Sequence, residues 1–202
     1  MKLEIDFLPS KIVCVGRNYA DHAAELGNDV PKEPLLFLKA PSAMILSGDD
    51  IVIPEYSHQV EHEGELAVVI GDVCKDLPDE ADVNEYIRGY TCLNDVTARD
   101  LQKSDVQFTR AKSFDTFCPI GPHIETDVDV SDLRVTVRLN GELRQDGRTA
   151  EMVFPVEFLI RYISRMMTLL PGDVIATGTP SGVSKMSPGD VCEVEIEGIG
   201  TL

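Results

Sequence analysis

The chain has 202 residues, of which 43% are hydrophobic and 26% charged, which supports one domain over residues 1–202 and argues against global disorder. Its formal net charge of −17 disfavours nucleic acids and anionic membranes as partners, because both are negatively charged. The five cysteines include no C-x-x-C pair, which disfavours a zinc ribbon or redox dithiol and favours a reducing compartment.

The N-terminus and the hydropathy of the chain predict a cytoplasmic protein. Residues Met1–Asp6 include charged side chains where a secretory signal peptide is apolar. No apolar run approaches the roughly 20 residues of a membrane-spanning helix. We therefore expect no membrane partner.

Strand patterns predominate along the chain. Short apolar runs of the kind found in buried strands occur at Ile12–Val15, Leu35–Leu38 and Leu66–Ile70. Apolar and polar side chains alternate over residues 134–139 and again over residues 192–197, which is typical of a strand with one solvated face. Asn140-Gly141 follows the first of these two stretches and predicts a tight hairpin turn.

Helix patterns are fewer. Residues 156–167 place apolar side chains on one helical face, and residues 18–26 form a short candidate helix before Gly27. Residues 79–88 are a third candidate, with acidic residues early and Arg88 late. Two Pro-Gly-Asp-Val turns, each before a short apolar strand, predict a β meander or roll near the C-terminus. The pattern indicates an α+β fold that is rich in β-structure.

Glu63 and Glu65 stand at the start of the third apolar run. On a strand they project from one face, and neighbouring carboxylates repel each other unless a cation lies between them. Oxygen ligands suit Mg²⁺, Mn²⁺ or Ca²⁺ rather than zinc. Alternating glutamates also line solvated strands, which is our interpretation of Glu193, Glu195 and Glu197, so this pattern alone leaves both interpretations open.

Other polar residues are candidates for the chemistry of a site. Asp95 lies among apolar residues, where an unpaired carboxylate is costly, although a turn or cap position would also satisfy it. His22 and Glu25 share a helical face, so they form either a general base or an ordinary surface pair. Lys112 is suited to offset an oxyanion, and Thr177–Gly182 offers hydroxyl and N–H groups to an anion, with a solvated lysine and a plain turn as the alternatives.

These candidates lie within a longer series of segments: Cys14–His22, Glu33–Lys39, His62–Leu66, Asp95–Asp100, Ala111–Asp115, Val137–Glu142 and Gly172–Pro180. In order and local sequence this series resembles the fumarylacetoacetate hydrolase family. The resemblance is closest to the short, single-domain branch of acylpyruvate hydrolases and oxaloacetate decarboxylases. It implies a mixed β-sandwich roll of the type found in the C-terminal domain of that family, and a homodimer.

The resemblance also implies roles for nine residues. It places a metal, expected to be Mg²⁺ with Mn²⁺ or Ca²⁺ as alternatives, on Glu63, Glu65 and Asp95. It assigns catalysis to His22, Glu25 and Lys112, and substrate contacts to Arg17, Gln102 and Thr179.

The reaction that the resemblance implies is cleavage of a C–C bond in a small 2-oxo acid through a metal-bound enolate. The bond is broken by acylpyruvate hydrolysis or by oxaloacetate decarboxylation. In hydrolysis, His22 backed by Glu25 would deprotonate a water, and Lys112 would offset the oxyanion. One alternative is a 2-hydroxyhepta-2,4-diene-1,7-dioate isomerase or 5-oxopent-3-ene-1,2,5-tricarboxylate decarboxylase of aromatic catabolism. A non-catalytic metal- or metabolite-binding protein is an alternative from a different class.

Overall fold

The computed structural model describes residues 8–202, so the N-terminal residues Met1–Asp6 considered above lie outside the described part. Seven strands form the larger sheet, in the order β2-β1-β11-β5-β6-β8-β3. Their bounds are β1 Ile12–Gly16, β2 Leu35–Lys39, β3 Met44–Leu46, β5 Gly64–Ile70, β6 Ile87–Asn94, β8 Cys118–Glu125 and β11 Val174–Ala176.

A smaller sheet of four strands has the order β10-β9-β12-β13, and β4 pairs with β7 apart from both sheets. Their bounds are β9 Arg134–Leu139, β10 Glu142–Arg148, β12 Cys192–Ile196, β13 Gly200–Thr201, β4 Val60–Glu61 and β7 Thr97–Ala98. The β9–β10 hairpin turns at the predicted Asn140-Gly141, both of which have positive φ. Both Pro-Gly-Asp-Val turns precede strands as predicted, but β11 belongs to the larger sheet, so only β12 joins the expected meander.

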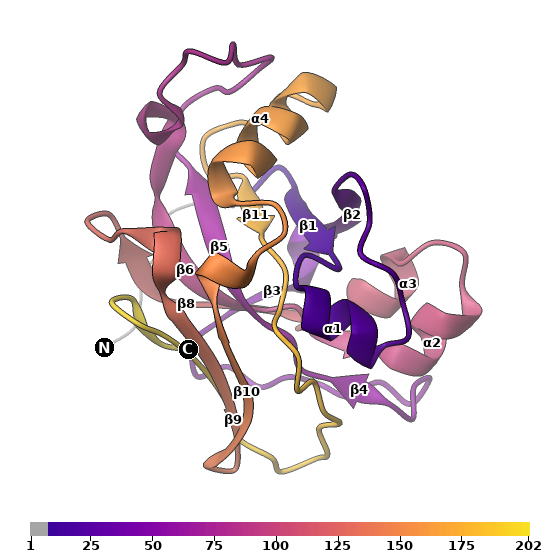
Figure 1. Cartoon of the computed structure of the whole chain (residues 1–202). Coiled ribbons are helices and arrows are strands. Elements are labelled where there is room, and N and C mark those ends of the chain that lie inside the picture. The colour runs from indigo at the N-terminus through magenta and orange to yellow at the C-terminus, as the bar shows by residue number, and fades with distance from the viewer. Residues whose placement is uncertain (1–7) are drawn as a thin grey trace.

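In the described part of the chain, four α-helices accompany the sheets: α1 Ala20–Glu25, α2 Arg99–Ser104, α3 Thr109–Lys112 and α4 Val156–Met166. Single turns of 3-10 helix are η1 Pro41–Ala43, η2 Val83–Tyr86, η3 Val130–Asp132 and η4 Thr149–Glu151. Figure 1 shows α1, α2 and α3 gathered on the side of the molecule near β1 and β2, with α4 lying near β11. Within residues 8–202, no helix has the length and apolar character needed to cross a bilayer.

The predicted helix over residues 79–88 is wrong. Only Val83–Tyr86 are helical, as one 3-10 turn, and Ile87 already begins β6. Asp82 caps that turn by accepting a hydrogen bond from the Asn84 N–H at 3.0 Å. Only Ile87 and Arg88 of this stretch belong to β6, and the segment before them contacts α4, where Arg161 donates to the Ala81 carbonyl at 2.6 Å. Tertiary contacts thus outweigh the local preference for helix.

Strand β5 lies at the centre of the core and is buried on both faces. Leu66, Val68 and Ile70 pack in one cluster with Leu159 and Ile160 of α4. Each such side chain contributes about 1.5–3 kcal/mol when fully buried. Ala67 points the other way, into a second cluster. By alternation, Glu63 and Glu65 lie on the Ala67 side of the strand, which is where the polar site is built.

Candidate active site

Three carboxylates meet at the paired ends of β5 and β6. Glu63 directly precedes β5, Glu65 is its second residue, and Asp95 directly follows β6. The antiparallel pairing places Gly64 opposite Asn94, and the Asp95 N–H donates to the Glu63 carbonyl at 2.8 Å. One carboxylate oxygen of each residue lies within 4.8 Å of the others, and all three side chains are buried. The structure therefore brings the predicted metal ligands together, whereas Glu193 and Glu195 are exposed as expected.

Two buried lysines neutralise part of this charge. Lys112 Nζ donates to Glu63 Oε2 at 2.7 Å and to Asp95 Oδ2 at 2.6 Å. Lys39 Nζ donates to Asp95 Oδ1 at 2.6 Å. The Phe37 ring lies 5.0 Å from the Lys112 ammonium, which adds a cation–π contact. Lys112 is thus buried and paired with carboxylates, which rules out the alternative of a solvated lysine.

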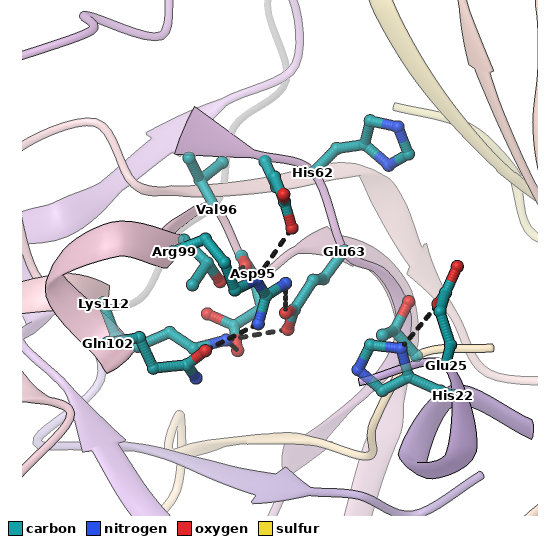
Figure 2. A network of polar contacts seen from close by, with 12 residues as sticks. His22, Glu25, His62, Glu63, Asp95, Val96, Arg99, Gln102 and Lys112 are labelled. Atoms are coloured by element: carbon teal, nitrogen blue, oxygen red, sulfur yellow. Dashed lines mark hydrogen bonds and ion pairs between the residues drawn. The ribbon is translucent and has the colours of Figure 1, made fainter. Parts of the chain in front are cut away.

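Arg99 is a third buried cation of the site, and it is 2% exposed. Its guanidinium pairs with Glu63 and, at 2.7 Å, with Glu61 Oε2, while Nη1 donates to Gln102 Oε1 at 2.7 Å (Figure 2). A planar guanidinium suits such simultaneous contacts in fixed directions. Arg99 therefore fixes the orientations of both Glu63 and Gln102.

Sequence reasoning assigned no role to Lys39 or Arg99, although both lie in segments that carried the resemblance. A signal was present at Lys39, which ends a run of apolar residues that became β2. A charged side chain at the end of a buried strand needs a counter-charge, and here Asp95 supplies it. Arg99 gave no comparable local signal, because it begins a polar helix.

The pKa values show how the charges are balanced. Burial raises the pKa of Glu65, and the neighbouring Asp95 and Glu63 raise it further. Burial also opposes ionisation of Glu63, but Lys112 and Arg99 outweigh it and hold its pKa below the ordinary range. The pKa of Lys112 is raised despite its burial, because Asp95 and Glu63 favour its charged form. Negative charge is thus least compensated at Glu65.

This donor set fits a hard dication. Glu65 accepts the Gly178 N–H at 2.8 Å, but within residues 8–202 it forms no ion pair. Three adjacent buried carboxylates with excess negative charge suit Mg²⁺, Mn²⁺ or Ca²⁺, which prefer oxygen ligands. No cysteine or histidine joins the cluster among the described residues, so a soft metal is disfavoured.

His22 and Glu25 lie on one face of α1, as predicted. Nδ1 of His22 is 3.3 Å from Glu25 Oε2, and Glu25 Oε1 accepts the Gly182 N–H at 3.1 Å. When Nδ1 carries the proton that faces Glu25, Nε2 keeps its lone pair and can act as a base. In Figure 2 the second ring nitrogen points toward the carboxylate cluster.

One cavity of about 360 Å³ joins these features. All nine residues for which the sequence implied roles line it: Arg17, His22, Glu25, Glu63, Glu65, Asp95, Gln102, Lys112 and Thr179. Arg17 has a φ of 59°, an uncommon backbone conformation for a residue with a side chain. The next residue, Asn18, holds this turn by bonding both to Phe154 and to the Thr177 carbonyl. The cavity thus has carboxylates at one wall and an imidazole at another.

The chain can now be compared with known proteins. The sequence profile described as fumarylacetoacetate (FAA) hydrolase C-terminal matches residues 11–202. The mitochondrial oxaloacetate tautomerase of Bos taurus is 42% identical over 194 residues, which cover 93% of this chain and 87% of that protein.

Two solved structures extend the comparison to the fold. The 2-hydroxyhepta-2,4-diene-1,7-dioate isomerase from Mycobacterium marinum is 49% identical with a TM-score of 0.89, over 96% of this chain and 73% of that one. The fumarylpyruvate hydrolase from Pseudomonas aeruginosa, in complex with Mn²⁺ and pyruvate, is 32% identical with a TM-score of 0.89, over 96% of this chain and 88% of that one. These similarities confirm the β-rich α+β fold that was expected, and the chain belongs to the fumarylacetoacetate hydrolase family.

Proposed function

We propose that this protein is a divalent-metal-dependent enzyme that cleaves a C–C bond in a small 2-oxo acid, by acylpyruvate hydrolysis or oxaloacetate decarboxylation. One observation carries the proposal: a single cavity joins a buried carboxylate trio to an imidazole held by a carboxylate. The names of the relatives support it, since they act on oxaloacetate, a dienedioate and fumarylpyruvate.

Glu63, Glu65 and Asp95 would hold the metal, with Mg²⁺ as our proposed ion. A bound dication would act as a Lewis acid on the 2-oxo group and favour negative charge on its oxygen. The Mn²⁺ in the Pseudomonas hydrolase structure supports a metal of this class. Arg99 bonds to Glu63 and Lys39 bonds to Asp95, and these bonds keep the two carboxylates in place.

His22 is the group that we assign to proton transfer. In acylpyruvate hydrolysis, Nε2 removes a proton from a water, which attacks the distal carbonyl carbon. The bond from that carbon to the methylene group then breaks, which releases a carboxylic acid and the enolate of a 2-oxo acid, and the enolate takes up a proton on carbon. Glu25 holds the imidazole in the required tautomer and stabilises its protonated form. Lys112 offsets negative charge that develops on the substrate, and Arg17, Gln102 and Thr179 contact its remaining polar groups.

A second candidate is tautomerisation of oxaloacetate, which the Bos taurus relative favours by its name. This reaction moves a proton between carbon and oxygen and needs no water as nucleophile. The same cavity supplies a base at His22 and a cation at Lys112 for such a transfer. The isomerase from Mycobacterium marinum represents a further proton-transfer reaction on a related skeleton.

A substrate panel tests the proposal. Purified protein loaded with Mg²⁺, Mn²⁺ or Ca²⁺ should consume acetylpyruvate or oxaloacetate, and EDTA should abolish the activity. Separate assays for CO₂ release, acid release and enol absorbance distinguish decarboxylation, hydrolysis and tautomerisation. Turnover of 2-hydroxyhepta-2,4-dienedioate alone would refute the preferred assignment. Binding of Mg²⁺ with no turnover of any of these acids would favour a non-catalytic binding protein.

We also propose that the enzyme is a cytoplasmic homodimer whose partners are limited to its small 2-oxo acid substrate. Light scattering on the purified chain tests the assembly. A monomeric mass at assay concentrations would contradict it.

A further inference from the structure

Gln145 is a buried amide on a mostly exposed strand. The residues before it on β10, Glu142 to Arg144, are exposed, whereas Gln145 is 0% exposed. The pairing of β10 with β9 shifts register between Leu143 and Gln145, which marks a β-bulge. A bulge changes the direction of a side chain, and this one turns the amide toward the larger sheet.

The Gln145 amide has all of its hydrogen-bonding capacity satisfied. Oε1 accepts the Gly64 N–H at 3.1 Å and lies 2.9 Å from His62 Nδ1. Nε2 donates to Thr179 Oγ1 and to the Pro180 carbonyl, both at 2.7 Å. Gly64 lies between two of the metal-ligand candidates, and Thr179 lines the cavity. One side chain thus bonds both to the carboxylate strand and to the neighbouring segment at Thr179 and Pro180.

Two glycines allow the segment Thr179–Gly182 to lie directly against β10. A Cβ on Gly147 would approach the Pro180 ring to 2.5 Å, and a Cβ on Gly182 would approach the Arg144 carbonyl oxygen to 2.0 Å. Both distances are too short for real atoms, so these contacts require glycine. The segment is therefore held on β10 by backbone packing as well as by the Gln145 amide.

The same segment reaches the proposed base. The Gly182 N–H donates to Glu25 at 3.1 Å, and Glu25 lies beside His22. We infer that Gln145 is a positioning residue, which docks Thr179–Gly182 on β10 and so places both Thr179 and Glu25 at the cavity. This inference rests on the proposed function, because the placement matters only if His22 transfers protons there. The positioning role of Gln145 would make the smaller sheet a support of the site, although within residues 8–202 no residue of β10 lines the cavity.

Two variants with matched controls test the inference on the metal-loaded full chain. Gln145→Met keeps the volume of the side chain and removes its hydrogen bonds. The control Thr149→Val removes a buried hydroxyl that bonds Leu133 and Val130 at 2.7 Å each, away from the cavity. Gly182→Ala adds the clashing Cβ at a φ of 101°. Its control, Gly189→Ala, adds one at a φ of 91° with nothing within 4 Å.

Three readouts are compared: kcat, KM and amide hydrogen exchange in segments 177–184 and 20–28. Both test variants should lower kcat by about 10- to 100-fold, as for other groups that orient catalytic residues. KM should rise by a smaller factor, because Thr179 is only one of the proposed substrate contacts. Exchange should accelerate in both segments. The controls should lose stability but keep kcat and the wild-type exchange there. A uniform loss of stability would not give this kcat-against-KM split.

Test variants that match their controls in kcat and in exchange would overturn the inference. If Gln145→Met does not fold, Gly182→Ala and its control decide alone. If the wild-type protein turns over none of the 2-oxo acids, the proposed function fails, and the exchange data then decide the docking. Faster exchange in both segments of the test variants would support it, and unchanged exchange would refute it.

Discussion

Glu65→Gln should stabilise the metal-free protein while abolishing its response to metal. Glu65 is 2% exposed and lies beside Glu63 and Asp95 without an ion pair of its own among the described residues. Two unit charges roughly 5 Å apart repel by about 3 kcal/mol at an effective dielectric constant near ~20. The glutamine keeps an acceptor for the Gly178 N–H, so the main local hydrogen bond survives.

The stability that Glu65→Gln gains should be smaller than this repulsion energy, because Lys112 already offsets part of the repulsion. We expect about 1–3 kcal/mol at neutral pH, which raises Tm by about 2–12 °C in a chain of this length. Because folding raises the pKa of Glu65, wild-type stability falls as pH rises above the ordinary glutamate value near ~4.3. The advantage of the variant should therefore grow with pH and vanish in acid.

Thermal melts in EDTA, in Mg²⁺, and in Mg²⁺ with oxalate measure both effects. The wild-type protein should gain Tm from the metal and more from the metal with oxalate, since each binds the folded state. Glu65→Gln should have a higher Tm than wild type in EDTA, and its Tm should not rise on addition of metal or of metal with oxalate. The control Glu193→Gln, on an exposed strand face, should stay within about 0.5 kcal/mol of wild type throughout. A metal-free Glu65→Gln that melts no higher, or that keeps the metal shift, would refute the assignment of Glu65.

Three further substitutions test the proposed base His22, the buried Lys112 and the buried Asp173. His22→Ala should damage acylpyruvate hydrolysis far more than oxaloacetate decarboxylation, because only hydrolysis needs an activated water; equal losses in kcat/KM would contradict that role. Lys112→Met should destabilise the metal-free protein by about 3–5 kcal/mol, because it leaves buried carboxylates unpaired. In thermal melts, Mg²⁺ should recover part of the lost stability. A variant Tm equal to that of wild type in EDTA would count against the ion pairs. Asp173→Asn should cost about 1–3 kcal/mol at pH 7 in urea titrations. Although burial opposes ionisation of Asp173, bonds from Lys11 and Ser10 hold its pKa low, so its stabilisation is present above about pH 3.9 and is lost as pH falls through the lower native value. If the difference in unfolding free energy between Asp173→Asn and wild type stays unchanged below the native pKa of Asp173, this explanation is wrong.

Local sequence determined the elements whose patterns agree with their final surroundings. The apolar run at residues 66–70 became the buried β5, and the helical face over residues 156–167 became α4. Asn140-Gly141 specified its hairpin because few residues tolerate its positive φ values. Residues 79–88 show the limit of such patterns, because tertiary contacts, such as the bond from Arg161 of α4 to the Ala81 carbonyl, overrode a helix-like sequence.

The candidate site was likewise predictable only in part from local sequence. The resemblance identified the family and nine of the residues that line the cavity, whereas local pattern could not separate Glu65 from Glu193. Only the pairing of β5 with β6 made that distinction, because it placed Asp95 beside Glu63 and brought both carboxylates next to Glu65, which has no ion pair of its own within residues 8–202. Lys39, Arg99 and Gln145 acquire their roles from partners that lie far away in the sequence. The bonds from Lys39 to Asp95, from Arg99 to Glu63 and from Gln145 to Thr179 span 56, 36 and 34 residues. The sequence by itself therefore determined which residues could perform the chemistry. The tertiary structure decided how their charges are compensated, because burial and long-range pairing set that balance.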